Sequence, residues 1–191
     1  MGVNLVKGAN LSLTKSAPTM QVALFGLGWD ARTTTGTDFD LDASALLVGA
    51  EGKVRSDADF IFFNQPKSSC GSVEHLGDNR TGVGDGDDEV IRVRLGDVPA
   101  DVDRVVFFAS IYDGQTRSQS FGMVRGAYIR VTDEASSVEI GRYDLTEDAS
   151  TETAMAFGEM YRNGSDWKFR AVGQGYAAGL AGVASDYGVN V

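Results

Sequence analysis

The sequence predicts an all-β protein, built as a two-sheet β-sandwich with pseudo-duplicated halves and one short C-terminal helix. Short segments in which apolar and polar residues alternate recur along the chain, as in strands that bury one face. Glycine and polar turn residues separate these segments. A weak internal similarity relates two stretches, in which Trp29-Asp30 or Tyr112-Asp113 precedes a polar loop, a phenylalanine and a strand. We therefore expect two related β halves packed face to face as a single domain over residues 1–191.

The individual elements follow from periodicity and from turn chemistry. Residues 20–27 and 104–109 are almost continuously apolar, as in buried strands, whereas residues 90–95 alternate cleanly. Asn163-Gly164 favours a hairpin, so we interpret residues 154–162 as a strand and not as a helix. The expected strands are 3–5, 9–13, 20–27, 38–48, 59–64, 90–95, 104–109, 127–131, 139–145, 154–162 and 166–171, and the expected helix is 176–187.

Charge and cysteine content limit the possible partners. The formal net charge is −10 with a sequence pI near 4.5, so non-specific binding to a nucleic acid is excluded and the partner should be cationic or neutral. Cys70 is the only cysteine, which rules out an internal disulfide and indicates a reducing, cytoplasmic location. No stretch approaches transmembrane length, so we expect no direct membrane insertion.

An acidic loop from Gly77 to Glu89 carries carboxylates on a glycine-rich backbone. It is not an EF-hand, because Arg80 occupies the third position after Asp78 and a strand follows the loop. A solvated loop is one explanation, and a magnesium site supporting phosphoryl chemistry is another. Calcium is the third, since it takes oxygens from carboxylates, asparagine and backbone carbonyls, and the loop offers all three kinds. The side-chain donors are Asp78, Asn79, Thr81, Asp85, Asp87, Asp88 and Glu89.

A second acidic cluster lies on the strand expected at 38–48. Alternation would place Asp38, Asp40 and Asp42 on one face, with successive carboxylates roughly 6.5 Å apart. Such a face is either open to solvent or neutralised by cations. In the second case, Asp40 and Asp42 would complete one or two metal sites with the acidic loop.

These segments together resemble the TerD family of bacterial stress and tellurite-resistance proteins. The resemblance rests on residues 40–44, 77–82, 84–89, 150–155 and 173–176, and it covers nearly the whole chain. It implies a β-sandwich with calcium sites at one end and a role in resistance to tellurite and other chemical stress. It also implies one or two Ca²⁺ ions held by Asp40, Asp42, Asp78, Asn79, Asp85, Asp87, Asp88 and Glu89.

The resulting hypothesis is a cytoplasmic, calcium-binding, non-enzymatic protein that serves as an interaction module in a stress complex. The resemblance implies protein partners that include membrane-associated stress proteins. The alternative is a magnesium-dependent enzyme or nucleotide-binding protein that handles nucleotides or phosphate, with Arg80, Arg32 and Lys53 as candidates for a positive clamp. Direct handling of tellurium oxyanions is a third hypothesis, opposed by repulsion between an anion and a protein of charge −10.

Overall fold

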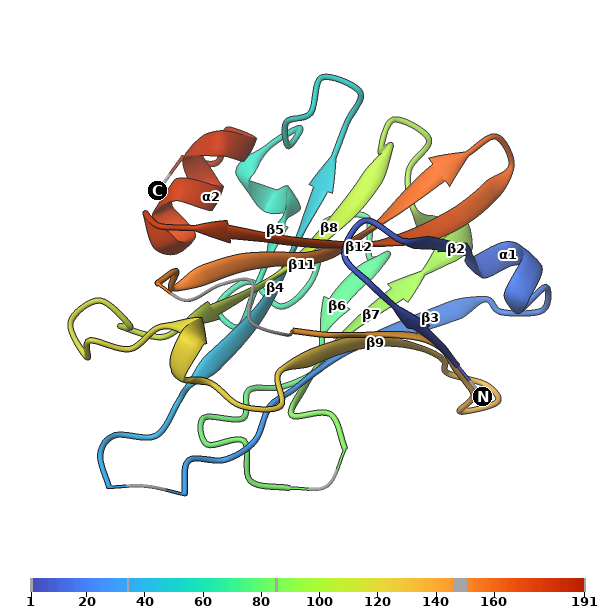
Figure 1. Ribbon diagram of the computed structural model, residues 1–191. Helices are drawn as coiled ribbons and strands as arrows, with labels where there is room; N and C mark the ends of the chain where they lie inside the picture. Colours follow the sequence, from blue (N-terminus) through green and yellow to red (C-terminus); the bar gives the residue numbers. More distant parts are fainter. Residues whose placement is uncertain (1, 34, 85, 146–150, 191) are drawn as a thin grey trace.

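Two six-stranded sheets pack face to face in the computed structural model, which describes residues 2–33, 35–84, 86–145 and 151–190 (Figure 1). The first sheet has the order β1 (Val3–Leu5), β10 (Glu139–Asp144), β9 (Tyr128–Asp133), β3 (Val22–Gly28), β7 (Glu89–Arg94) and β6 (Val73–His75). The second has the order β2 (Asn10–Ser12), β12 (Asp166–Tyr176), β11 (Ala154–Asn163), β8 (Arg104–Ile111), β4 (Leu41–Val48) and β5 (Phe60–Ile61). The predicted sandwich is confirmed.

Strands from both halves of the chain contribute to both sheets. β3 belongs to the first sheet and β4 to the second, while β8 belongs to the second and β9 to the first. The two similar sequence stretches are thus two of the connections that carry the chain from one sheet to the other. All strand pairs are antiparallel except β1 with β10, which are parallel.

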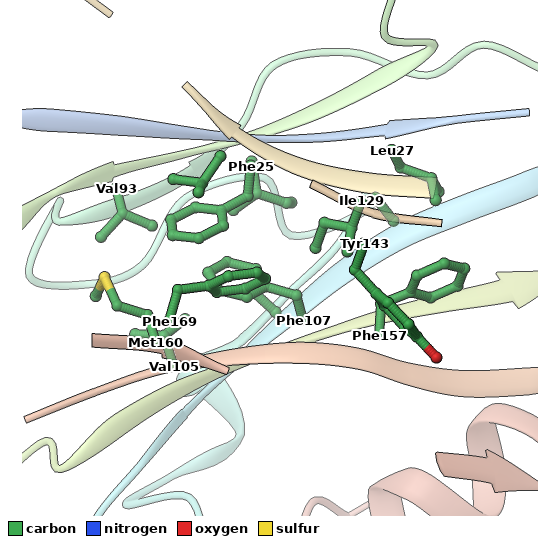
Figure 2. Close-up of a cluster of buried hydrophobic side chains, with 14 of the residues drawn as sticks. Phe25, Leu27, Val93, Val105, Phe107, Ile129, Tyr143, Phe157, Met160 and Phe169 are labelled. Atoms are coloured by element: carbon green, nitrogen blue, oxygen red, sulfur yellow. The ribbon is translucent and has the colours of Figure 1, made fainter. Parts of the chain in front are cut away.

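Aromatic side chains from both sheets form the centre of the core. Phe25 of β3 stacks on Phe107 of β8, with ring centroids 3.9 Å apart, and its ring lies 5.6 Å from that of Phe169 on β12. Figure 2 shows these three rings between the sheets, with Val93 and Met160 beside them. Burial of such large apolar side chains is the dominant stabilising contribution.

The helix α2 (Gly179–Tyr187) covers part of the outer face of the second sheet. Its Val183 and Ala184 pack with Leu46 of β4 and Phe108 of β8 in a second apolar cluster. This explains why Leu46 and Val48 of β4 are buried, although they point away from the main core. No helix among the described residues is both long and apolar enough to span a membrane.

The strand predicted at residues 38–48 begins only at Leu41, so Asp38 and Asp40 lie in the preceding loop. Side chains satisfy the backbone of that loop. Gln119 donates from Nε2 to the carbonyls of Thr37 and Asp38 at 2.9 and 3.2 Å, and the Trp29 indole donates to the Phe39 carbonyl at 3.2 Å.

Other elements also differ from the prediction: β6 was not predicted, and β8 and β9 each extend two residues further than expected. Residues 13–16, expected to begin within a strand, form the single turn α1 (Leu13–Ser16), because Ser12 accepts from the Lys15 amide and caps it. The strand expected at 59–64 is reduced to β5 after a 3₁₀ turn, Asp57–Asp59. The final helix starts at Gly179, since β12 continues through Tyr176. Further 3₁₀ turns occupy Leu95–Asp97 and Phe121–Met123.

The strand registers bring three long connections to the same end of the sandwich. Leu27 of β3 lies opposite Glu89 of β7, Gly28 lies opposite Tyr128 of β9, and Leu41 of β4 lies opposite Ile111 of β8. The described residues of 29–40, 76–88 and 112–127 therefore meet at one end, in the lower and left part of the view in Figure 1. Acidic segments that are distant in sequence become neighbours there.

Candidate metal centre

Three aspartates converge where β4 begins. Asp40 precedes β4, Asp42 is its second residue, and Asp78 comes from the acidic loop between β6 and β7. One carboxylate oxygen from each lies within 4.8 Å of the others. The structure thus brings together three of the eight predicted ligands, from both of the acidic clusters seen in the sequence.

Crowding of these carboxylates makes full ionisation unfavourable. Burial raises the pKa of Asp42 to about 7, and the nearby charges of Glu89, Asp40 and Asp78 add to the effect. Burial and the charge of Asp78 also raise the pKa of Asp40, while Arg117 and Arg80 act in the opposite direction. A bound cation would stabilise the ionised forms.

The donor set fits a hard divalent cation. Asp40 Oδ1 is buried and has no hydrogen-bond partner among the described residues, so the cluster contains an unsatisfied acceptor. Calcium takes six to eight oxygens at roughly 2.3–2.6 Å. Three carboxylates supply only part of that shell, which leaves positions for water or for a ligand.

Asp87 is tied to the outer face of the first sheet. Its Oδ1 accepts from Arg130 Nε at 2.7 Å and from the Tyr128 hydroxyl at 3.0 Å. The carboxylate lies directly over Gly26 of β3, where an added Cβ would stand 2.1 Å from it. This glycine therefore leaves the space in which the carboxylate anchors the acidic loop.

Asp88 fastens the acidic loop to the connection after β3. The Trp29 amide donates to its Oδ2 at 2.9 Å, and Asn79 Nδ2 donates to its Oδ1 at 2.8 Å. The Asn79 side-chain oxygen in turn accepts from the Thr81 amide at 3.2 Å, which forms a local turn. In this structure Asp88 and Asn79 satisfy one another and shape the loop.

Glu89 holds β4 and the acidic loop together from the first residue of β7. Its side chain is fully buried and accepts from the amides of Ala43, at 2.6 Å, and Asn79, at 3.3 Å. His75 Nε2 lies 3.2 Å from the carboxylate, and the Gly77 amide donates to His75 Nδ1. Because Nδ1 accepts, Nε2 carries the proton and donates to Glu89. Burial raises the pKa of Glu89, whereas these donors lower it.

The acidic residues therefore divide into two groups in this structure. Asp40, Asp42 and Asp78 face one another, whereas Asp87, Asp88 and Glu89 each bind a different neighbouring segment. Asp85 lies outside the described residues.

A cavity of about 320 Å³ opens beside the aspartate trio. Besides the three aspartates it is lined by Phe63, Asn64, Arg80, Tyr112 and Arg117. Of the three cations proposed as a clamp, Arg80 is therefore present. Arg32 lines a different cavity, and Lys53 bonds to the Asp186 carbonyl near the C-terminal helix.

Sequence reasoning missed Phe63, Asn64, Tyr112 and Arg117 as site residues. No local motif surrounds them, since they come from the segment after β5 and from the connection after β8. Only the internal similarity could have indicated Arg117. It relates the loop after Tyr112-Asp113, which contains Arg117, to the loop that precedes Asp40 and Asp42.

The raised pKa of Asp42 predicts a pH effect on the metal-free protein. Between its ordinary value of 3.8 and about 7, the folded state binds more protons at Asp42 than the unfolded state does. The contribution of Asp42 to stability is thus fully present below pH 3.8 and is lost as the pH rises through 7. Urea denaturation in EDTA measures the free energy of unfolding at each pH. As the pH rises, that of Asp42→Asn should increase relative to that of the unmodified protein. A pH-independent difference between the two proteins would contradict this.

Comparisons with known proteins agree with this architecture. The family model for the TerD domain matches residues 1–187. The tellurium resistance protein TerD of Alcaligenes sp. is 62% identical over 190 residues, covering 100% of this chain and 99% of the relative. General stress protein 16U of Bacillus subtilis is 48% identical over 192 residues, covering 100% of each.

Two solved structures share the fold. A crystal structure of a protein of unknown function superposes with a TM-score of 0.72 at 24% identity, covering 90% of this chain and 99% of that one. A crystal structure of a TerD homologue from Streptomyces coelicolor A3(2) superposes with a TM-score of 0.66 at 20% identity, covering 85% and 94%.

Proposed function

The chain belongs to the TerD family, and from this premise we propose that it is a calcium-binding stress-response protein that works as a non-enzymatic interaction module. The names of its relatives support a role in stress, since they refer to tellurium resistance and to general stress. The observation that carries the calcium proposal is the convergence of Asp40, Asp42 and Asp78, with Asp40 Oδ1 buried and unsatisfied. We place one ion there.

Calcium suits this cluster better than magnesium does. Magnesium demands near-ideal octahedral geometry at about 2.0–2.1 Å, while calcium accepts irregular sets of oxygen ligands. The three aspartates come from a loop, a strand and a second loop, and they face a wide cavity. Calcium can therefore complete its shell with water in the cavity.

The surroundings of the cluster support a binding role and not catalysis. His75, the sole histidine, has a side chain only 2% exposed, and its two ring nitrogens are engaged by Glu89 and Gly77. It is thus unavailable as a general base for a substrate in the cavity. This weighs against the magnesium-dependent enzyme considered from the sequence.

Apolar side chains exposed on the segments around the cluster support an interaction surface. Leu76, just before the acidic loop, and Val83, within it, are exposed, and Phe63 and Tyr112 border the cavity. Calcium would fix Asp78 against β4 and so order the segment that presents Leu76 and Val83. We propose that this surface binds protein partners in the cytoplasm, among them membrane-associated stress proteins.

Calcium should raise the melting temperature of chelator-stripped protein. A ligand at about 100 times its dissociation constant stabilises the folded state by roughly 2.7 kcal/mol. For a chain of this length that corresponds to a shift of about 5–10 °C. Isothermal titration calorimetry and thermal melts with calcium, with equimolar magnesium and after EDTA would measure this. An absence of heat and of a shift with calcium would refute the proposal.

A further inference from the structure

The cavity beside the aspartate trio is larger than a metal site requires. Its volume is about 320 Å³, whereas one water molecule occupies about 30 Å³ of liquid. A bare cation and the waters needed to complete its shell would fill only part of it. The remaining walls carry two guanidinium groups, an amide and two aromatic rings, from Arg80, Arg117, Asn64, Phe63 and Tyr112.

Occupancy by a divalent cation would reverse the charge of this cavity. With all three carboxylates ionised, the two guanidinium groups leave it net negative without metal, and a divalent cation makes it net positive. Although the protein has a net charge of −10, this cavity would then be positively charged only when the metal is bound. An anion would thus be repelled by the empty site and attracted by the filled one.

Arg117 is the side chain best placed to receive such an anion. Its guanidinium lies over the Tyr112 ring, 5.1 Å from the ring centroid, and makes no hydrogen bond to any of the described residues. It acts on Asp40 only through its charge, by which it lowers the pKa of that carboxyl. By contrast, Arg80 already pairs with Asp78 at 3.3 Å. The N–H groups of Arg117 are therefore available to a ligand in the cavity.

The loop that carries Arg117 is held in an unusual backbone conformation. Asp113 and Ser118 both have a φ of 52°, in the left-handed region that non-glycine residues rarely adopt. Gln119, which is buried, ties the end of this loop to the segment before Asp40 through the carbonyls of Thr37 and Asp38. The tether and the backbone conformation together keep Arg117 beside the aspartate trio.

We propose that the calcium-loaded cavity binds an oxyanion of the phosphate or carboxylate class, held jointly by the metal and by Arg117. The anion's oxygens fill open positions of the calcium shell, and the planar guanidinium of Arg117 forms paired hydrogen bonds with two of them. Tyr112 and Phe63, which are 50% and 37% exposed, offer ring surface to an apolar or planar group attached to the anion. This inference rests on the calcium site proposed above.

Calorimetry with two small probes tests the inference. Phenyl phosphate and benzoate share the ring and differ in the anion, so they distinguish the two oxyanion classes. Each is titrated into calcium-saturated protein, into EDTA-treated protein and into calcium buffer alone. We expect at least one probe to bind the calcium-saturated protein and neither to bind the EDTA-treated protein.

Arg117→Gln should move the two affinities in opposite directions. Loss of a charge-assisted hydrogen bond should weaken probe binding by about tenfold or more. Loss of a nearby positive charge should make calcium bind about threefold tighter. A misfolded variant would bind both the probe and calcium more weakly. Weaker probe binding together with tighter calcium binding therefore cannot result from misfolding. Arg125→Gln is the matched control, because Arg125 lines a different cavity at this end, and it should leave probe binding unchanged.

The two proposals fail in different ways. Protein that binds calcium but neither probe, or probe binding that is unchanged in Arg117→Gln or in EDTA, would overturn the oxyanion site alone. Absence of calcium binding would overturn the proposed function, and the oxyanion site with it.

Discussion

Glu89→Ala should destabilise the metal-free protein by about 3 kcal/mol, although it removes a charge from a crowded acidic region. The substitution leaves the amide of Ala43 and the Nε2–H of His75 buried without an acceptor. It also relieves the repulsion that Glu89 exerts on Asp42. We expect the first effect to be larger, because the carboxylate accepts hydrogen bonds from β4, from the acidic loop and from His75.

Urea denaturation in EDTA measures this prediction, with Glu89→Gln as the matched control. Glutamine keeps the shape and can still accept from the Ala43 amide, so it should lose less stability than alanine does. If Glu89→Ala were as stable as the unmodified protein in EDTA and failed only to bind calcium, Glu89 would be a metal ligand. It would then not be a residue that stabilises the packing of the acidic loop on β4.

Asp78→Asn should have the opposite profile, because it should lose calcium binding without losing stability. Asp78 supplies one of the three converging carboxylates, and its partner Arg80 is a largely exposed side chain. Exposed ion pairs contribute little, so removing this one costs the metal-free protein almost nothing. Removing the charge of Asp78 also reduces the electrostatic repulsion on Asp40 and Asp42. Calcium affinity should fall on the order of 100-fold, since the ion loses a charged ligand.

Calorimetry for affinity and thermal melts in EDTA for stability separate these effects. Asp97→Asn is a suitable control, because Asp97 is exposed in the 3₁₀ turn after β7, at the opposite end of the sandwich. Calcium affinity that survived in Asp78→Asn would show that the ion lies elsewhere on the acidic segments.

The sandwich could be predicted from the sequence because the alternation of apolar and polar residues follows which face of a strand is buried. From Ile91 to Arg94, β7 alternates in the sequence and in burial, and Asn163-Gly164 marks the β11–β12 hairpin. The start of β4 could not be predicted in this way. Residues 38–43 alternate, but the backbone of residues 37–39 is satisfied by Gln119 and Trp29, which are distant in sequence.

The site was predictable only where its chemistry is concentrated in one stretch. The two acidic clusters indicated Asp40, Asp42 and Asp78, but the sequence could not distinguish carboxylates that face one another from those that hold the loop. That division depends on donors from other strands, such as Arg130 and the Ala43 amide. The binding of calcium to any of these residues remains a prediction.

The first dozen residues form an edge strand in each of the two sheets. β1 lies along β10 at one edge of the first sheet, while β2 lies along β12 at an edge of the second (Figure 1). One short segment therefore protects two open edges, whose free backbone groups would otherwise be available for pairing with other chains. Trimming this segment, or placing a bulky purification tag directly against it, would expose both edges at once and favour aggregation. A tag that is meant to be harmless is better placed after a flexible spacer.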